Sequence, residues 1–172
     1  MATARAEKDR LFKTSRDSPL KPPDREAFTA LIYFPPDQSY RTAAALRVAP
    51  EAEQAVVTMP TSTGQRRDYR QIGALEFNLK GQPLSLVAFT EAADSTTRRL
   101  FVPFGDLTNG AETYPAGRYL DLDPTPTGLY DLDFNKAYNP FCAYNETYDC
   151  PYPPPSNRLK IPIRAGEKTF TK

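Results

Sequence analysis

The chain has 172 residues, enough to bury a core that depends on neither a metal nor a disulfide. Its 22 basic and 21 acidic residues give a net charge of +1 without a concentrated basic block, so we expect no nucleic-acid partner. The sequence contains no histidine, which excludes histidine-based catalytic triads and histidine-bearing metal sites.

Residues 1–31 predict a helical segment that packs on the rest of the protein. Residues 3–14 are rich in helix formers with Thr3 as a candidate N-cap, and Asp24 is the candidate cap of a second helix that ends near Leu31. The prolines between them predict an extended connector. The start of the chain lacks the apolar region of a signal peptide, and no apolar run is long enough to span a membrane. We therefore expect a cytoplasmic protein with no membrane partner.

Residues 32–172 show the short alternating patterns of β-strands. The residues around 40–48 and 55–59 alternate between apolar and polar, which predicts two half-buried strands. The clearest alternation follows and predicts a β-hairpin that turns at Gly81. Its inward side chains are expected to be Leu75, Phe77, Leu79, Leu84 and Leu86.

The second half of the chain predicts further strands. They are expected at residues 100–104, at 113–122 after a tight Asn109-Gly110 turn, and at 159–163. Pro162 cannot donate a ladder hydrogen bond, so the last strand should lie at an edge or contain a bulge. About eight short strands with little helix after residue 31 predict an all-β, single-domain fold, an antiparallel β-barrel or sandwich with short N-terminal helices.

The loop at residues 133–158 is rich in tyrosine, asparagine and proline and contains both cysteines. Short polar side chains on a proline-stiffened backbone are suited to a rigid binding surface. With residues 103–119, this loop is expected to form the mouth of a site for a small polar or anionic ligand. The candidate ligand-binding residues are Asp106, Tyr114, Arg118, Asp133, Asn135, Tyr138, Asn139, Tyr144, Asn157, Arg158 and Glu167.

Two arginines are the candidate anion-binding groups of this site. Arg118 and Arg158 could hold a carboxylate or phosphate through bidentate hydrogen bonds. The alternative is that they neutralise Asp106, Asp133 or Glu167 inside the protein. On the first reading, Arg118 and at least one of Asp106, Asp133 and Arg158 line a common cavity with tyrosines of the 138–148 stretch.

Two other functions remain open. One is an enzyme that uses Asp106, Asp133 or Glu167 as acid or base, for example a hydrolase or isomerase. The other is a structural or interaction module without a pocket. An acidic group surrounds the 124–128 turn, but its spacing matches no EF-hand loop, so no metal is expected. The acidic residues of this group are Asp121, Asp123, Asp131 and Asp133.

Cys142 and Cys150 are eight positions apart in the same loop. This spacing permits a disulfide in an oxidising compartment. Without a secretion signal, reduced thiols with a structural role are expected, because the chain has no histidine to activate a catalytic cysteine.

Several motifs are long and specific. They are Ser18-Pro19-Leu20, Leu31 to Pro35, Phe101 to Phe104, Gly117 to Leu120, DFNKAYNPFCAY, CPYPPPSNRL and Ala165-Gly166-Glu167. With these motifs the chain resembles the prokaryotic domain of unknown function 1684 over nearly its whole length. The resemblance implies no activity, substrate or cofactor, and it places the family's signature polar residues in the second half of the chain.

Overall fold

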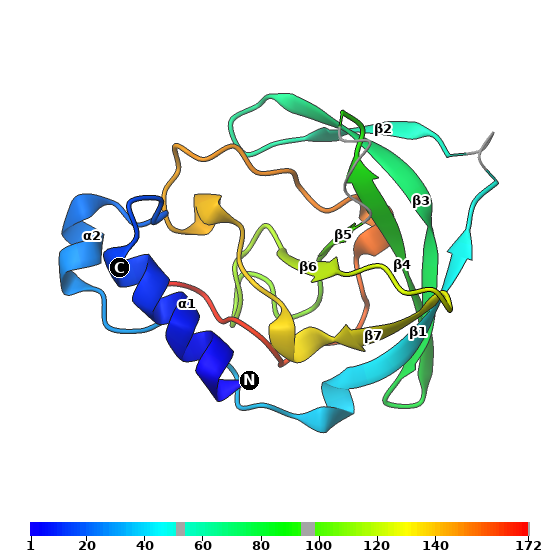
Figure 1. The fold of residues 1–172 in the computed structure, drawn as a ribbon, viewed down its shortest axis with the longest axis horizontal. Helices are drawn as coiled ribbons and strands as arrows, with labels where there is room; N and C mark the ends of the chain where they lie inside the picture. Colours follow the sequence, from blue (N-terminus) through cyan, green and yellow to red (C-terminus); the bar gives the residue numbers. More distant parts are fainter. Residues whose placement is uncertain (51–53, 94–98, 172) are drawn as a thin grey trace.

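The computed structural model describes residues 1–50, 54–93 and 99–171 and shows a strongly curled antiparallel sheet with a helical N-terminal part to one side (Figure 1). The helices are α1 (Ala2–Thr14) and α2 (Pro22–Ala27), with short 3-10 turns η1 (Gln38–Tyr40), η3 (Phe134–Lys136), η4 (Phe141–Ala143) and η5 (Pro155–Asn157). The strands are β1 (Arg41–Val48), β2 (Val56–Pro60), β3 (Arg66–Leu79), β4 (Gln82–Glu91), β5 (Leu100–Phe104), β6 (Arg118–Leu122) and β7 (Leu129–Asp133).

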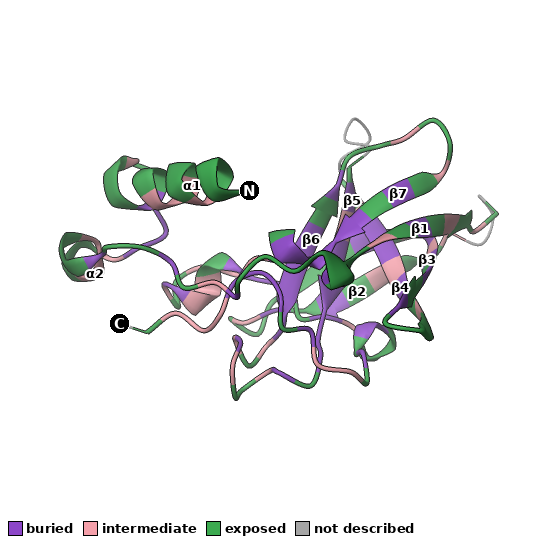
Figure 2. Cartoon of the chain, turned by 90° about the horizontal axis from the view of Figure 1, so that it is seen from below, coloured by how far each residue is buried: buried purple, intermediate pink, exposed green. Residues whose placement is uncertain are grey.

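Within the described residues, these strands form one seven-stranded sheet of order β6-β5-β4-β3-β1-β7, and β2 pairs separately with β3. The strand pairs are antiparallel. The sheet curls into a half-barrel whose inner face is buried (Figure 2). The prediction of an all-β fold with short N-terminal helices is confirmed.

The predicted hairpin is confirmed as β3 and β4. Lys80 and Gly81 have φ values of 50° and 80°, the positive angles that a tight hairpin turn needs. Phe77 lies in the main core, opposite Leu84 on β4 and next to Phe134. Leu75, Leu79 and Leu86 are also buried there, and Leu84 packs against the core while partly exposed.

A β-bulge reverses the faces of the first half of β3. Gly73 pairs with Ala88, but Gln71 pairs with Phe89, so β3 has one more residue than β4 at this point. Because successive strand residues point to opposite faces, Tyr69 then lies on the outer face of the sheet. There it packs with Phe89 in an apolar cluster separate from the main core.

Gly73 is required at the bulge because β1 approaches too closely for a side chain. A Cβ on Gly73 would lie 2.1 Å from the carbonyl oxygen of Arg47. We expect Gly73→Ala to lower the free energy of unfolding by about 1–3 kcal/mol, since the backbone must move to relieve this overlap. Urea denaturation measures the loss, and an unchanged midpoint would show that β1 can shift without cost.

The N-terminal helices differ from the prediction at their starts. The first helix begins at Ala2 after Met1, so Thr3 is not its N-cap. The second begins at Pro22 and ends at Ala27, which makes Asp24 a first-turn residue rather than the cap. Pro22 and Pro23 occupy the first helical positions, where the missing N–H is not needed, so the predicted connector between the helices ends at Lys21.

Two predicted strands of the second half are also wrong. Residues 159–163 bend at positions 160 and 161 and form no strand, and β6 begins only at Arg118 rather than at Thr113. Asn109 and Gly110 lie within the long loop that connects β5 to β6. The burial of Leu159 and Ile163 was predicted correctly. The segment makes two main-chain hydrogen bonds, from Leu159 N–H to Gly105 O at 2.8 Å and from Leu107 N–H to Ile161 O at 3.3 Å, and side chains add further bonds, as described next.

Candidate functional site

Arg118 and Asp106 form an ion pair inside the protein. The Arg118 side chain is 0% exposed, and its Nη2 donates to Asp106 Oδ2 at 3.0 Å and to Ile163 O at 2.8 Å. Its Nη1 donates to the carbonyl oxygens of Ala165 and Glu167. Burial lowers the pKa of Arg118, and the charge of Asp106 opposes that shift. The Arg118 guanidinium therefore binds the C-terminal segment at three carbonyl oxygens, those of Ile163, Ala165 and Glu167.

Glu167 joins the helical part to the half-barrel. Its carboxylate is buried, and Oε1 accepts hydrogen bonds from Lys8 of α1 and from the Tyr33 hydroxyl at 3.4 Å. Oε2 accepts from the Tyr144 hydroxyl at 2.7 Å and from the Asn139 N–H at 2.8 Å. Burial, followed by the charge of Glu167, raises the pKa of Tyr144, so this phenol remains a donor.

Asp133 and Asn135 form a separate pair after β7. Asp133 Oδ1 accepts hydrogen bonds from the main-chain N–H and the side-chain amide of Asn135, at 3.0 and 2.8 Å. Asn135 in turn exchanges two hydrogen bonds with the main chain of Asp37, both at 2.9 Å. Asp133 therefore caps the 3-10 turn that Asn135 anchors to the chain before β1.

Asn157 fills a gap between β4 and β5. Its amide donates to the carbonyl oxygens of Val87 and Pro103 at 2.9 and 2.8 Å, and its oxygen accepts from the Val87 N–H at 2.8 Å. Pro103 has no N–H to offer the ladder, so a buried amide supplies the missing partner. The next residue, Arg158, is exposed and forms an isolated bridge with Gly105.

A cleft lined by several aromatic side chains lies on the outer face of the sheet, away from the buried groups described above. Residues 138–151, which we call the roof, leave the half-barrel and return toward β2 (orange in Figure 1). At one end, the main chain of Tyr138 exchanges two hydrogen bonds with Tyr119 at the β6 edge. At the other, Cys150 O accepts from the Ser62 N–H at 2.9 Å. The roof is thus fastened to two distant parts of the sheet.

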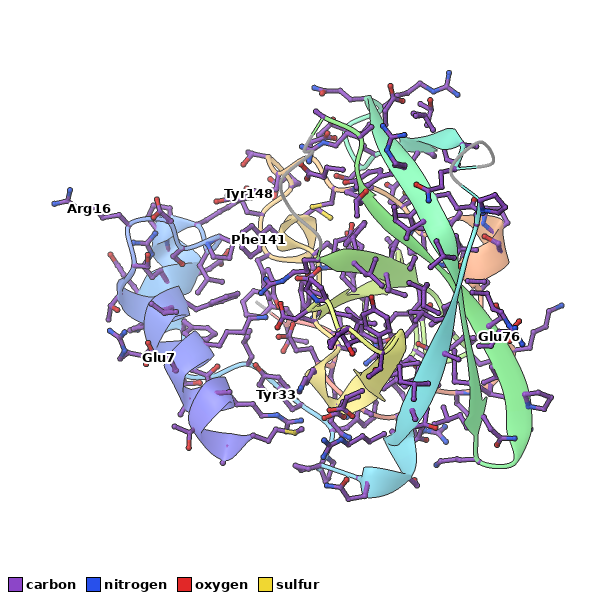
Figure 3. The ribbon with its side chains drawn as sticks, turned by 45° about the vertical axis from the view of Figure 1, so that its right-hand side comes forward. Glu7, Arg16, Tyr33, Glu76, Phe141 and Tyr148 are labelled. Carbon is purple, nitrogen blue, oxygen red and sulfur yellow. The ribbon has the colours of Figure 1, made fainter. Side chains whose placement is uncertain are left out.

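Between the roof and the sheet is a cavity of about 600 Å³, which we call the aromatic cleft. Its aromatic lining residues are Tyr69, Phe101, Tyr119, Tyr138, Phe141 and Tyr148. The Tyr69 and Phe101 rings stack with centroids 5.3 Å apart, and Phe101 meets Tyr119 edge to face at 4.8 Å. Figure 3 shows Phe141 and Tyr148 close together between the helical part and the sheet, where they pack edge to face at 5.2 Å.

Two guanidinium groups also line the aromatic cleft. Arg67 Nε donates to Asp149 Oδ2 at 3.0 Å, and Arg99 Nε donates to Asp123 Oδ1 at 2.9 Å. The side chains of Arg67 and Arg99 are 46% and 55% exposed. The Asp123 side chain is 79% exposed, so its pair with Arg99 contributes only about 0–1 kcal/mol, and Arg99 can turn toward a bound anion at small cost.

Two tyrosine hydroxyls of the cleft donate hydrogen bonds to neighbouring oxygens. Tyr138 donates to Asp121 Oδ2 at 2.8 Å, and Tyr119 donates to the carbonyl oxygen of Pro151. Burial is the largest cause that raises the pKa of Tyr69, Tyr119 and Tyr138 above the usual tyrosine value. The cleft therefore combines aromatic ring faces with tyrosine hydroxyls and two partly exposed guanidinium groups.

Most of the residues that the sequence singled out do not meet in one cavity. Arg118 contacts Asp106 in an enclosed pair, whereas Asp133 bonds to Asn135 and Arg158 forms a bridge with Gly105. Asn139, Tyr144 and Glu167 form a second cluster, and Tyr114 lies with its hydroxyl 3.6 Å from Cys142 Sγ. Of the candidate ligand-binding residues, Tyr138 lines the aromatic cleft.

Sequence reasoning missed four lining residues of the cleft: Arg67 and Tyr69 of β3, Phe101 of β5, and Arg99 just before β5. One signal for Tyr69 was present, because a glycine inside a strand pattern often marks a bulge, and Gly73 does so here. Without the bulge, Tyr69 would be assigned to the inner face. No comparable local signal marks the arginines.

No helix in the described part of the chain is both long and apolar enough to cross a membrane. Among the same residues, no group of three or more cysteine, aspartate or glutamate side chains is arranged to hold a metal ion.

Comparisons with known proteins agree with this fold. Residues 26–168 match the family described as Protein of unknown function (DUF1684). The solution NMR structure of an uncharacterized protein of Haloarcula marismortui is similar to the chain, with 43% identity and a TM-score of 0.75. That likeness covers 98% of this chain and 91% of the archaeal one. The search of curated proteins gives no match.

Proposed function

The chain belongs to the DUF1684 family of proteins of unknown function, and from the geometry of its own cleft we propose that it binds a small organic anion that carries a ring. The observation that supports this proposal is the convergence of aromatic side chains from β3, β5, β6 and the roof on one cavity. Its volume of about 600 Å³ suits a small molecule. Tyr69, Phe101 and Tyr119 offer ring faces and edges against which a flat ligand can pack.

The charged groups favour an anion over a cation. Three carboxylates line the cleft. Asp121 already accepts from Tyr138, and Asp149 accepts from Thr63 and Arg67, which leaves Glu91 beside the two guanidinium groups. A guanidinium has five N–H donors, more than one neighbouring carboxylate can use. Arg67 therefore keeps donors for a carboxylate, sulfonate or phosphate group on the ligand.

The experiment is calorimetric titration of the full chain with 1-naphthalenesulfonate, a flat ring system with one anionic group. We expect saturable binding at one site and weaker binding of the matched cation, a naphthyl trimethylammonium. Phe101→Leu should raise the Kd about two- to tenfold, because a ring contact contributes about 0.5–1.5 kcal/mol. Arg99→Ala should raise it up to about fivefold.

Arg47→Ala is the matched control, because Arg47 is an exposed strand arginine paired with Glu76 and does not line the cleft. Its Kd should equal that of the wild type. Tighter binding of the cation, or an equal loss of affinity in Arg47→Ala and Arg99→Ala, would contradict the proposed function.

A further inference from the structure

The two cysteines face each other within the roof. Cys142 lies in η4 and Cys150 lies just before Pro151, and both are free thiols. The N–H of Cys142 donates to the Sγ atom of Cys150 at 3.2 Å. The chain between them reverses at Asn145, whose side chain accepts from the Thr147 N–H at 3.1 Å. The sulfur of Cys150 is therefore held against the backbone of Cys142.

Ser62, in the turn between β2 and β3, fixes this approach from outside the roof. Its hydroxyl donates to Tyr148 O at 3.0 Å and accepts from the Cys150 N–H at 3.0 Å. Its own N–H donates to Cys150 O at 2.9 Å. Both sides of Cys150 are thus anchored, and closing a bond to Cys142 requires little movement of the chain.

The two thiols have different surroundings. Cys142 is half-buried, and the Tyr114 hydroxyl lies 3.6 Å from its sulfur, whereas Cys150 is 7% exposed. Hydrogen bonds from Cys150, Tyr114 and Ser62 lower the pKa of Cys142 to about 6. The same pairing raises the pKa of Cys150. A thiolate is the nucleophile in thiol chemistry, so Cys142 is the more reactive of the two.

From this geometry we propose that Cys142 and Cys150 are a redox-active dithiol whose substrates are low-molecular-weight disulfides, with Cys142 as the attacking group. In the first step, the Cys142 thiolate attacks one sulfur of the disulfide RSSR, forms a mixed disulfide and releases RS⁻. In the second, Cys150 loses its proton and attacks the Cys142 sulfur, which releases the second RS⁻. The protein loses two electrons and two protons as it gains the Cys142–Cys150 bond, and RSSR becomes two RSH.

This inference is independent of the proposed ligand, so its test uses no ligand. The reduced full chain is incubated with glutathione disulfide and sampled by alkylation and peptide mass mapping. We expect the wild type to lose both thiols together, without disulfide-linked dimers. Cys150→Ser should accumulate glutathione on Cys142. Cys142→Ser should react at least about tenfold more slowly at its remaining thiol, because that thiol is buried and protonated.

Circular dichroism shows whether each variant is folded. If a serine variant does not fold, the earliest mixed disulfide of the wild type identifies the attacking cysteine, which we expect to be Cys142. The proposal is overturned if the native wild type does not react or stops at a mixed disulfide. It is also overturned if the earliest adduct forms on Cys150, or if folded Cys142→Ser reacts as fast as the wild type.

Discussion

Replacing Arg118 with methionine is expected to lower the free energy of unfolding by about 3–5 kcal/mol. Methionine fills much of the same space but leaves the Asp106 charge buried without its cation. It also removes donors from the carbonyl oxygens of Ile163, Ala165 and Glu167. Each of these losses leaves a buried polar group unpaired, which is why the expected effect is large. Chemical denaturation of the purified variant measures it.

The matched control is Arg164→Met, which removes a largely exposed arginine paired with Glu112. Its effect should stay within about 1 kcal/mol. The double variant Arg118→Met with Asp106→Asn should be more stable than the sum of the two single effects predicts, because no lone charge remains. Equal losses at Arg118 and Arg164 would mean that Arg118 is not the internal counter-ion of Asp106.

The second large effect is expected from Phe77→Ala in the hairpin. Phe77 is buried, and its ring centroid lies 5.9 Å from that of Phe134. Removing the ring loses the free energy gained by its burial and leaves a cavity. Together these two effects lower the free energy of unfolding by about 3–5 kcal/mol. Urea denaturation with an unchanged slope would show that stability alone has changed.

Glu76→Ala is the control for this change, since Glu76 lies on the opposite face of the same strand and is exposed. It should alter stability by no more than about 0.5 kcal/mol. If Glu76→Ala costs as much as Phe77→Ala, the assignment of the inner and outer faces of β3 is incorrect.

The parts of the fold that were predictable are those set by neighbouring residues. Alternation with period two gives the faces of the hairpin from Leu75 to Leu86, and the glycine at position 81 marks its turn. The bulge in β3 was harder to predict from the sequence, because its cause lies in another strand. There, the backbone of Arg47 lies too close to Gly73 for a side chain. When two strands that are distant in sequence make such a contact, the glycine is its only sign in the local sequence.

The segment at residues 159–163 shows a second limit. Its alternating apolar pattern suggested a strand, but its hydrogen-bond partners include the side chains of Asp106 and Arg118. A local sequence pattern does not show that these distant side chains reach this segment. The same holds for the candidate site. Planar donors and acceptors such as Asn157 were correctly recognised as unusual, yet Asn157 bonds to the backbone of β4 and β5 instead of lining a shared cavity.

The most direct test of the aromatic cleft is an NMR titration of the ¹⁵N-labelled chain with 1-naphthalenesulfonate. We expect the largest shift changes at the amides of Phe101, Tyr119 and Tyr138, with little change at Lys8 of α1. This pattern would place the anion between the roof and the outer face of the sheet. Shift changes centred on Lys8 and Glu167, or no saturable change at any residue, would contradict the assignment of the aromatic cleft as the binding site.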